Sequence, residues 1–237
     1  MKIEKYNKGG EWSFCYGAFP TFELIKNKPE CAVKVFLHSK LNKSEEIDNL
    51  ITLCNKKGVP VEYDDKAINK VADKENIFVV GVFKKYAGNF TSGNNLVLVN
   101  PSDAGNLGTI MRTSLGFGVK NLVIVHPAVD HFNPKVVRAS MGAIFSLNIA
   151  EFESLEDYLK TANQKYFFML NGRQILGKHT IPSGNYDLVF GNEAHGLPNV
   201  CLEKGNSILI KHSKDIDSLN LPISVGIALF EFNRNKF

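Results

Sequence analysis

Three short stretches, far apart in the chain, combine glycines with polar side chains that can do chemistry. They are Asn106-Leu107-Gly108 with Arg112, Gly191-Asn192-Glu193-Ala194-His195-Gly196-Leu197, and Ile216-Asp217-Ser218-Leu219-Asn220-Leu221-Pro222-Ile223-Ser224-Val225-Gly226. Each lies beside an apolar run, where α/β enzymes place their ligand-binding loops. All four arginines also lie after residue 93, and the guanidinium fork suits phosphate recognition. The stretches therefore predict an active site built from three loops.

Apolar, β-branched runs alternate with helical segments from residue 94 onward. We expect buried strands at residues 96–100, 121–125, 166–170, 186–191 and 207–210, and helices near residues 106–116, 134–143, 153–163, 195–203 and 220–232. Such alternation predicts an α/β fold, with a parallel sheet covered by helices on both faces.

Arg112 belongs to the helix expected after the first loop. Apolar residues at 107, 110, 111 and 115 share one face of that helix, and Arg112 falls outside it. The side chain is therefore aimed at the edge of the sheet, close to Asn106. A surface arginine with no role is the alternative for Arg112 considered alone, but its fixed spacing from Asn106 and Gly108 favours the site.

In their order and spacing, the three stretches resemble the signature motifs of the SpoU/TrmH family of RNA ribose 2'-O-methyltransferases, within the SPOUT class. The resemblance covers residues 94–232 closely. It implies S-adenosyl-L-methionine as cofactor and rRNA or tRNA as substrate. It also implies a C-terminal trefoil knot and a homodimer whose interface completes each site.

The resemblance also assigns roles to individual residues. The implied catalytic residues are Asn106, Arg112, Glu193, Ser218 and Asn220. The implied cofactor-binding residues are Gly191, Asn192, Glu193, Ile210, Ser218, Leu219 and Asn220. The expected RNA contacts are Arg112, Lys135 and Arg138. For Lys135 and Arg138, a solvated helix face is an equally good interpretation, and His195 is not expected to function because the family position varies.

The first ninety residues differ from the rest in their pattern of predicted strands and helices. A strand is expected at residues 33–37, and a helix at 44–56 with Ser44 as its N-cap; residues 14–26 look like an amphipathic helix start. The region is similar to the small L30e-like domain that precedes many family members and contacts RNA; an unrelated small α/β domain is the alternative. We place the domains at residues 1–92 and 93–237, joined near the polar segment 84–95.

The amino-acid composition is compatible with RNA binding but does not by itself predict the function. The net charge of +4 allows RNA binding without demanding it, and DNA is not expected as a partner. The four widely spaced cysteines are typical of a reduced cytoplasmic protein. No apolar run is long enough to span a bilayer, and no metal-ligand spacing is evident. A soluble cytoplasmic protein without a metal is expected.

Two other functional classes compete with the methyltransferase. One is an RNA-binding protein that keeps the fold without catalysis; the presence of Asn106, Arg112 and Glu193 together disfavours it. The other is a dinucleotide-dependent oxidoreductase, which the missing glycine fingerprint after the first strand disfavours. Transfer of tritium from labelled cofactor to total RNA discriminates the enzyme from the binding protein.

The role expected for Arg112 makes a first prediction. The residue either loses a proton with help from an RNA phosphate or orients that phosphate and stabilises the forming alkoxide. In both cases the Arg112→Ala variant should lose roughly 10²–10⁴-fold in turnover, the usual scale for such groups. Single-turnover methylation of RNA measures the loss, and an unchanged rate rejects the assignment.

Overall fold

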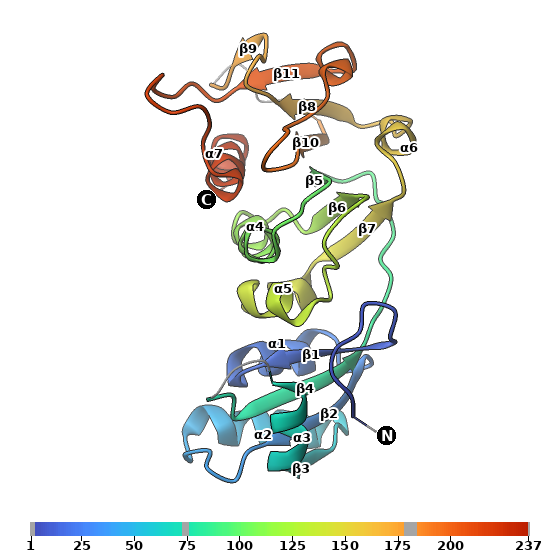
Figure 1. Ribbon diagram of the computed structural model, residues 1–237, viewed down its shortest axis with the longest axis vertical. Coiled ribbons are helices and arrows are strands. Elements are labelled where there is room, and N and C mark those ends of the chain that lie inside the picture. Colours follow the sequence, from blue (N-terminus) through green and yellow to red (C-terminus); the bar gives the residue numbers. More distant parts are fainter. Residues whose placement is uncertain (1–2, 73–75, 178–183, 237) are drawn as a thin grey trace. The chain divides into compact units, whose positions relative to one another are not determined.

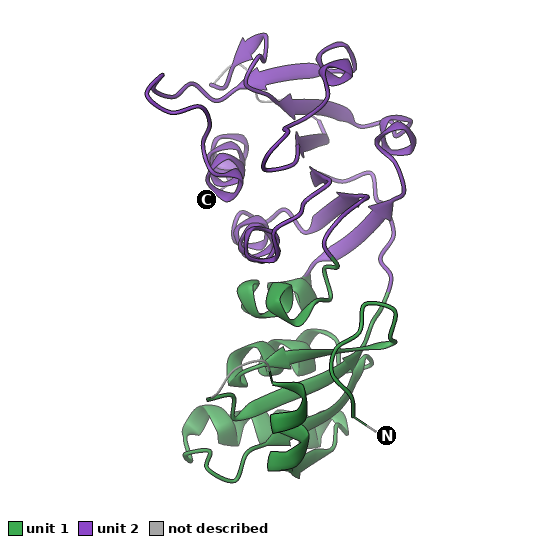
Figure 2. Ribbon diagram, viewed as in Figure 1, with its two compact units in different colours: residues 1–86, 130–146 green, residues 87–129, 147–237 purple. Residues whose placement is uncertain are grey.

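The computed structural model describes residues 3–72, 76–177 and 184–236. The chain forms two compact units (Figure 2). Unit 1 comprises residues 1–86 and 130–146, and unit 2 comprises residues 87–129 and 147–237. A segment from within the region expected as the second domain thus packs into unit 1.

Unit 1 is a four-stranded sheet with helices. The strand order is β1-β4-β2-β3, in which β4 pairs antiparallel with both β1 and β2, and β2 pairs parallel with β3. Its elements are β1 (Trp12–Tyr16), α1 (Ala18–Asn27), β2 (Ala32–Leu37), α2 (Glu45–Lys57), β3 (Val61–Tyr63), α3 (Asp65–Val71), β4 (Val79–Lys84), α5 (Pro134–Ala139) and the 3₁₀ helix η1 (Ala143–Ser146).

Local sequence explains where the helices of unit 1 begin and end. The Ser44 side chain accepts a hydrogen bond from the Ile47 amide and so caps α2 as expected, and Gly58 ends that helix at φ 71°. The expectation of one amphipathic start at 14–26 is wrong. Phe14 lies in β1, and Gly17, at φ 102°, separates that strand from α1.

Unit 2 is a seven-stranded sheet in which every pairing is parallel. The strand order is β7-β6-β5-β10-β8-β11-β9. Its elements are β5 (Asn95–Val99), α4 (Ala104–Gly116), β6 (Asn121–Val125), β7 (Asn148–Phe152), α6 (Leu155–Leu159), β8 (Gln164–Phe168), β9 (Gln174–Ile175), β10 (Tyr186–Phe190), the 3₁₀ helix η3 (Asn199–Glu203), β11 (Asn206–Leu209) and α7 (Leu221–Asn233).

Helices cover both faces of this sheet, as the alternating pattern predicted. One face presents Val97 and Val189, which pack with Tyr158 of α6 and Cys201 of η3 in a single core cluster. On the other face, the Phe232 ring of α7 lies 5.1 Å from the ring centroids of both Tyr166 and Tyr186. Figure 1 shows α4 and α7 on one side of the sheet and α6 on the other.

The position of β10 in the strand order decides which loops meet. This strand lies between β5 and β8, although β6, β7 and β8 precede it in the sequence. Parallel strands end at the same edge of a sheet, so the loop after β5 and the loop after β10 emerge side by side. Such reversals of strand order form ligand sites in α/β proteins.

Several sequence expectations for unit 2 need correction. Residues 195–203 do not form one helix: Asn192 and Gly196 form an isolated β-bridge, and only Asn199–Glu203 is helical. The helix expected at 134–143 ends at Ala139, because Met141 and Gly142 take positive φ angles of 51° and 80°. The strands β7 and β9 were not predicted.

Two features concern membranes and metals. Among the described helices, none is both long and apolar enough to cross a bilayer. The described residues also contain no group of three His, Cys, Asp or Glu side chains arranged to hold a metal ion.

A buried carboxylate organises the amino-terminal edge of the unit 2 sheet. Asp187 on β10 is fully buried and accepts hydrogen bonds from Asn95 Nδ2 at 2.7 Å, Asn163 Nδ2 at 2.8 Å and the Tyr158 hydroxyl at 2.8 Å. Burial, together with the Asp187 charge, raises the pKa of Tyr158 and so keeps its phenol protonated as a donor. Three segments of the chain are joined at this one side chain.

Loss of this carboxylate should destabilise unit 2. The Asp187→Ala variant leaves the buried Tyr158 hydroxyl without its acceptor, whereas the Asn95 and Asn163 side chains keep the Gly93 carbonyl as an acceptor. A loss of about 1–3 kcal/mol is therefore expected. Tyr158→Phe removes one donor and should cost about 1 kcal/mol. Urea unfolding measures both, with the exposed Asp157→Ala as control. An Asp187→Ala midpoint equal to that of the wild type would contradict this account.

Candidate active site

The first loop is fixed by a helix cap. The Asp103 side chain accepts a hydrogen bond from the Asn106 amide at 2.7 Å and so starts α4 directly after the strand β5. This cap leaves the Asn106 side chain free to face the neighbouring loop. One turn and a half further on, Arg112 is exposed, as its place off the apolar face predicted, and it makes no hydrogen bond or ion pair with any described residue.

The second loop is a tight turn that requires glycine. A Cβ atom at Gly191 would lie 2.1 Å from the Gly196 carbonyl carbon, so only glycine allows this approach. The Gly196 amide donates to the Asn192 carbonyl at 2.9 Å, and the Asn192 side-chain oxygen accepts from the Ala194 amide at 2.9 Å. The turn therefore points the Glu193 side chain away from its own loop.

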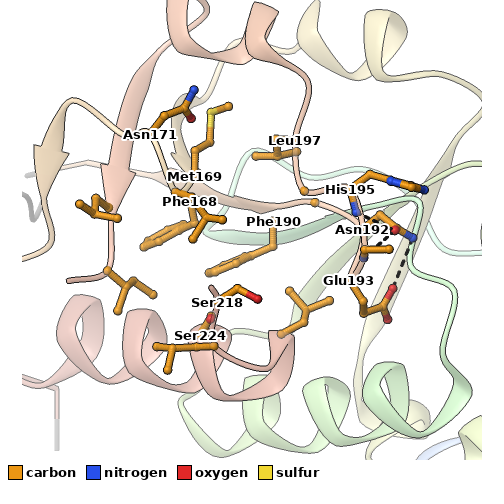
Figure 3. A pocket seen from close by; sticks show the side chains of 18 of the residues that line it. Phe168, Met169, Asn171, Phe190, Asn192, Glu193, His195, Leu197, Ser218 and Ser224 are labelled. Carbon is orange, nitrogen blue, oxygen red and sulfur yellow. Dashed lines mark hydrogen bonds between the residues drawn. The ribbon is translucent and has the colours of Figure 1, made fainter. Parts of the chain in front are cut away.

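The Glu193 carboxylate joins the two loops. One of its oxygens, Oε2, accepts from the Ser102 hydroxyl at 2.8 Å and the Ser102 amide at 3.2 Å. The other, Oε1, accepts from Asn106 Nδ2 and the Asp103 amide, both at 3.3 Å. Figure 3 shows Glu193 beside Asn192 at one end of a pocket. Two motifs that lie 87 residues apart in the chain therefore meet at one side chain.

Opposing effects set the charge of this group. Partial burial acts to raise the pKa of the Glu193 carboxyl, but hydrogen bonds from its own backbone, from Ser102 and from Asn106 together hold it below its ordinary value of 4.5. The carboxylate is therefore ionised at neutral pH. With both oxygens occupied by donors, it is suited to hold the loops and poorly suited to collect a proton.

Asn192 and Ser102 complete the junction. Asn192 Nδ2 donates to the Asn100 carbonyl at 2.8 Å and lies 3.3 Å from the Ser102 hydroxyl oxygen. Sequence reasoning predicted Asn192 but missed Ser102. The position of Ser102 just after the strand β5 is the feature that could have identified it. That position indicates a contact with Glu193 only when β5 and β10 are known to be neighbours.

A cavity of about 350 Å³ lies beside this junction, at the carboxyl ends of β8, β10 and β11. The Phe168 and Phe190 rings stack there, with centroids 4.4 Å apart and planes 6° from parallel (Figure 3). Its lining comprises Phe168, Met169, Leu170, Asn171, Phe190, Gly191, Asn192, Glu193, Ala194, His195, Gly196, Leu197, Asn199, Leu209, Ile210, His212, Ser218, Leu219, Leu221 and Ser224. An apolar wall with a few polar groups is typical of a small-molecule site.

Most of the residues predicted to bind a cofactor line this cavity. They are Gly191, Asn192, Glu193, Ile210, Ser218 and Leu219. Asn220 is outside the lining and stands at the N-cap of α7, where its carbonyl accepts from the Ser224 amide at 3.0 Å. Asn106 reaches the site through Glu193, whereas Arg112 does not line the cavity.

The remaining predicted residues, Lys135 and Arg138, belong to α5 in unit 1, where both are exposed. Lining residues that the sequence did not reveal include Phe168, Asn171, His212 and Ser224. Phe168 was missed because β8 ends at this residue, two residues earlier than expected, so that its ring stands at the carboxyl edge of the sheet.

The fold and the site define an α/β protein with a ligand site at the carboxyl edge of a parallel sheet. A sequence profile of the SpoU rRNA Methylase family matches residues 93–230, which is more than half of the chain. The chain therefore belongs to this family, and the family resemblance of its three motifs is confirmed.

Individual relatives are similar to this chain at modest identity. An uncharacterized tRNA/rRNA methyltransferase of Synechocystis is 32% identical over 60% of this chain and 53% of its own length. The 23S rRNA (adenosine(1067)-2'-O)-methyltransferase of Streptomyces laurentii is 28% identical over 76% of this chain and 72% of that protein. The chain spans about half or less of the length of the first curated relatives that it matches.

Among solved structures, the AdoMet-bound rRNA methyltransferase from Sinorhizobium meliloti superposes with a TM-score of 0.78 at 26% identity. The match covers 96% of this chain and 88% of that one. The likeness therefore includes residues of both units.

The junction makes a prediction for Glu193→Gln. Both carboxylate oxygens face donors, so an amide NH₂ must meet another donor at one of the two positions. Leaving such a group unsatisfied costs about 1–3 kcal/mol, and amide exchange at residues 102–106 should accelerate by about 10–100-fold. Hydrogen exchange with mass spectrometry measures this. The matched control is Glu203→Gln, an exposed carboxylate paired with Arg173; equal exchange in both variants would contradict the bridge.

Proposed function

We propose that the protein is an S-adenosylmethionine-dependent methyltransferase that acts on a ribose 2'-hydroxyl of rRNA or tRNA. The observation that carries the proposal is the bridge from Glu193 to Ser102 and Asn106. It joins two of the three family motifs beside a cavity that the third motif lines. The names of the Synechocystis and S. laurentii relatives support an RNA substrate, and the second name supports the 2'-O position.

The proposed cofactor fits the chemistry of the cavity. Adenosine needs apolar faces and a few hydrogen-bonding groups, which Phe190, Leu209 and the backbone of the Gly191 turn offer. The AdoMet bound to the S. meliloti relative supports this cofactor. When bound, it supplies an electrophilic methyl group. The residues proposed to hold it are Gly191, Asn192, Glu193, Ile210, Ser218, Leu219 and Asn220.

The mechanism requires the ribose 2'-oxygen to lose its proton as the new O–C bond forms. Glu193 holds the Asn106 loop in place, since all its acceptor positions face donors. Arg112, which has no partner among the described residues, is free to bind an RNA phosphate. In one alternative, the charged Arg112 guanidinium stabilises the forming alkoxide. In the other, the guanidinium first loses a proton to the phosphate and then accepts the proton of the 2'-hydroxyl. Ser218 and Asn220 complete the proposed catalytic set.

Unit 1 is proposed to contact the RNA as an L30e-like domain. The exposed cations Lys135 and Arg138 of α5 support this role, because exposed cations on a helix suit phosphate contacts. The proposed location is the cytoplasm, which the four free cysteines support.

A homodimer and a C-terminal trefoil knot complete the proposal. The helix α7 supports the dimer: it is apolar on all sides, yet Ile223 and Phe230 are each 56% exposed and Ile227 is 38% exposed. A helix that is apolar all round is normally buried. Contact with a second copy of the chain covers these side chains and completes each site.

Methyl transfer tests the function directly. The wild-type protein should bind S-adenosylmethionine in a calorimeter and transfer tritium from the labelled cofactor to rRNA or tRNA, with the product mapped as a 2'-O-methyl nucleotide. Binding of cofactor and RNA without transfer would instead establish the catalytically inactive RNA-binding protein. No cofactor binding at all would reject the proposal.

The Gly191 turn makes a sharper prediction for the same assay. Gly191→Ala should abolish cofactor binding, because the added Cβ collides with the Gly196 backbone. Gly58→Asn is the matched control: its φ of 71° is one that asparagine tolerates, a Cβ there meets open space, and Gly58 lies outside the cavity. Equal cofactor affinity in the two variants would remove the turn from the binding site.

The exposed face of α7 predicts the oligomeric state. The wild-type mass by light scattering should be twice the chain mass of 26.4 kDa. The double variant Ile223→Asp, Ile227→Asp should shift towards the single-chain mass, because burying two carboxylates at an apolar interface is costly. Ile216→Asp, at an equally exposed isoleucine outside α7, should remain dimeric. A wild type with the single-chain mass contradicts the dimer.

A further inference from the structure

The cavity beside Glu193 extends across the carboxyl ends of three parallel strands. β8 lies between β10 and β11 in the sheet, and residues that follow each of these strands line the cavity. Glu193 follows β10, whereas His212 follows β11. Neighbouring strands lie about 4.8 Å apart, so the ends of β10 and β11 are separated by about 10 Å. The cavity therefore has two chemically distinct ends.

One ring nitrogen of His212 is engaged within the protein and the other is not. Nδ1 lies 2.8 Å from the Ile210 carbonyl oxygen, which can only accept a hydrogen bond. In the neutral ring the proton is therefore on Nδ1, and Nε2 carries a lone pair. No described residue forms a hydrogen bond with Nε2. The half-buried His212 side chain thus offers the cavity an acceptor whose tautomer is fixed.

Several other side-chain acceptors in the cavity are already occupied. Both oxygens of Glu193 accept from donors of the loop after β5. The Asn192 side-chain oxygen accepts from two backbone amides of its own loop, and the Asn199 oxygen accepts from Asn171 Nδ2 at 3.2 Å. A bound molecule that presents an N–H donor near β11 therefore meets a free acceptor in His212.

The chemistry of the proposed cofactor decides which of its donors reaches this acceptor. In the proposed reaction, the sulfonium and the methyl group belong at the Glu193 end, where the Asn106 loop is held. The purine then extends towards β11, where Met169, Leu209 and Ile210 provide apolar surface. Such a surface suits a purine and not the charged amino-acid end of the cofactor. The donor that an adenine ring presents is its exocyclic amine.

We propose that His212 is a specificity-determining residue of the cofactor site, whose Nε2 accepts a hydrogen bond from the exocyclic amine of adenine. The inference rests on the proposed function and deepens it. A purine with oxygen in place of this amine presents an acceptor to Nε2, and the ring can donate to it only by giving up its bond to Ile210. The site therefore selects adenosine derivatives over their 6-oxo counterparts through a side chain.

Equilibrium binding tests the inference without reference to methyl transfer. The first probe is S-adenosylhomocysteine, which is the cofactor without its methyl group. The second probe is the analogue of this compound that has hydrogen in place of the 6-amino group. Isothermal titration calorimetry measures the Kd of each. The wild type should bind the analogue about 3–10-fold more weakly, as expected for the loss of one hydrogen bond.

Two variants separate the roles of the two ring nitrogens. The amide nitrogen of asparagine takes the place of Nδ1, so His212→Asn keeps the bond to Ile210 but has no acceptor at the place of Nε2. The amide of glutamine reaches the place of Nε2, so His212→Gln keeps an acceptor there but loses Nδ1. His212→Asn should bind the two probes equally, and His212→Gln should retain the preference for S-adenosylhomocysteine. A residue that only supports the Ile210 segment predicts the reverse order.

The matched control is His126→Asn. His126 is a half-buried histidine of unit 2 that lies outside the cavity and is hydrogen-bonded to Glu151. The control variant should keep the wild-type preference for S-adenosylhomocysteine. Thermal unfolding of each variant establishes that it is folded. If His126→Asn loses the preference as His212→Asn does, the preference does not depend on Nε2 and the inference is wrong.

The outcomes separate this inference from the proposed function. If the wild type methylates RNA but binds the two probes equally, the inference is wrong and the methyltransferase stands. If the preference follows Nε2 but no methyl group reaches RNA, the inference stands and the proposed enzyme falls. A third probe lacks the α-amino group of S-adenosylhomocysteine. If His212→Asn abolishes discrimination against this probe and not against the deaminated purine, the ligand lies the other way round and the inference is overturned.

Discussion

The site of this protein depends on one charged interaction, the carboxylate of Glu193 held by donors from the loop after β5. Backbone amides and side chains from residues 102–106 surround both oxygens, and this hydrogen bonding outweighs partial burial and keeps the group ionised. These hydrogen bonds connect the loop after β5 with the loop after β10. Glu193 and its loop form part of the lining of the cavity beside them.

The parallel α/β class of unit 2 could be predicted from the sequence, because alternating β-branched runs and helices leave few other solutions. The strand order could not. Placing β10 between β5 and β8 depends on contacts such as Asp187 with Asn95, which no local pattern encodes. The supposed helix at 195–203 failed for a related reason: the Gly191 and Gly196 approach imposes a turn over local helix preference.

Part of the candidate site could be predicted from residue types and from the spacing of the motifs. Glu193, Asn106 and Ser218 were predicted because their motifs resemble those of the SpoU family in order and spacing. Ser102 does not stand out, since a serine after a strand is ordinary until the neighbouring strand is known. Arg138 was recognised as a cation, yet its membership of unit 1 follows from tertiary packing alone.

The assembly of unit 1 from two separate segments has a consequence for its synthesis. The Ser13 hydroxyl donates to the Phe132 carbonyl, and the Phe83 ring meets the rings of Phe132 and Phe145 at 5.9 Å and 5.1 Å. A nascent polypeptide that ends near residue 92 lacks these partners and exposes the Phe83 surface to water. On the ribosome, the amino-terminal sheet must therefore wait for some fifty further residues before its packing is complete. Unit 1 therefore completes its packing only after the first part of unit 2, residues 87–129, has been synthesised.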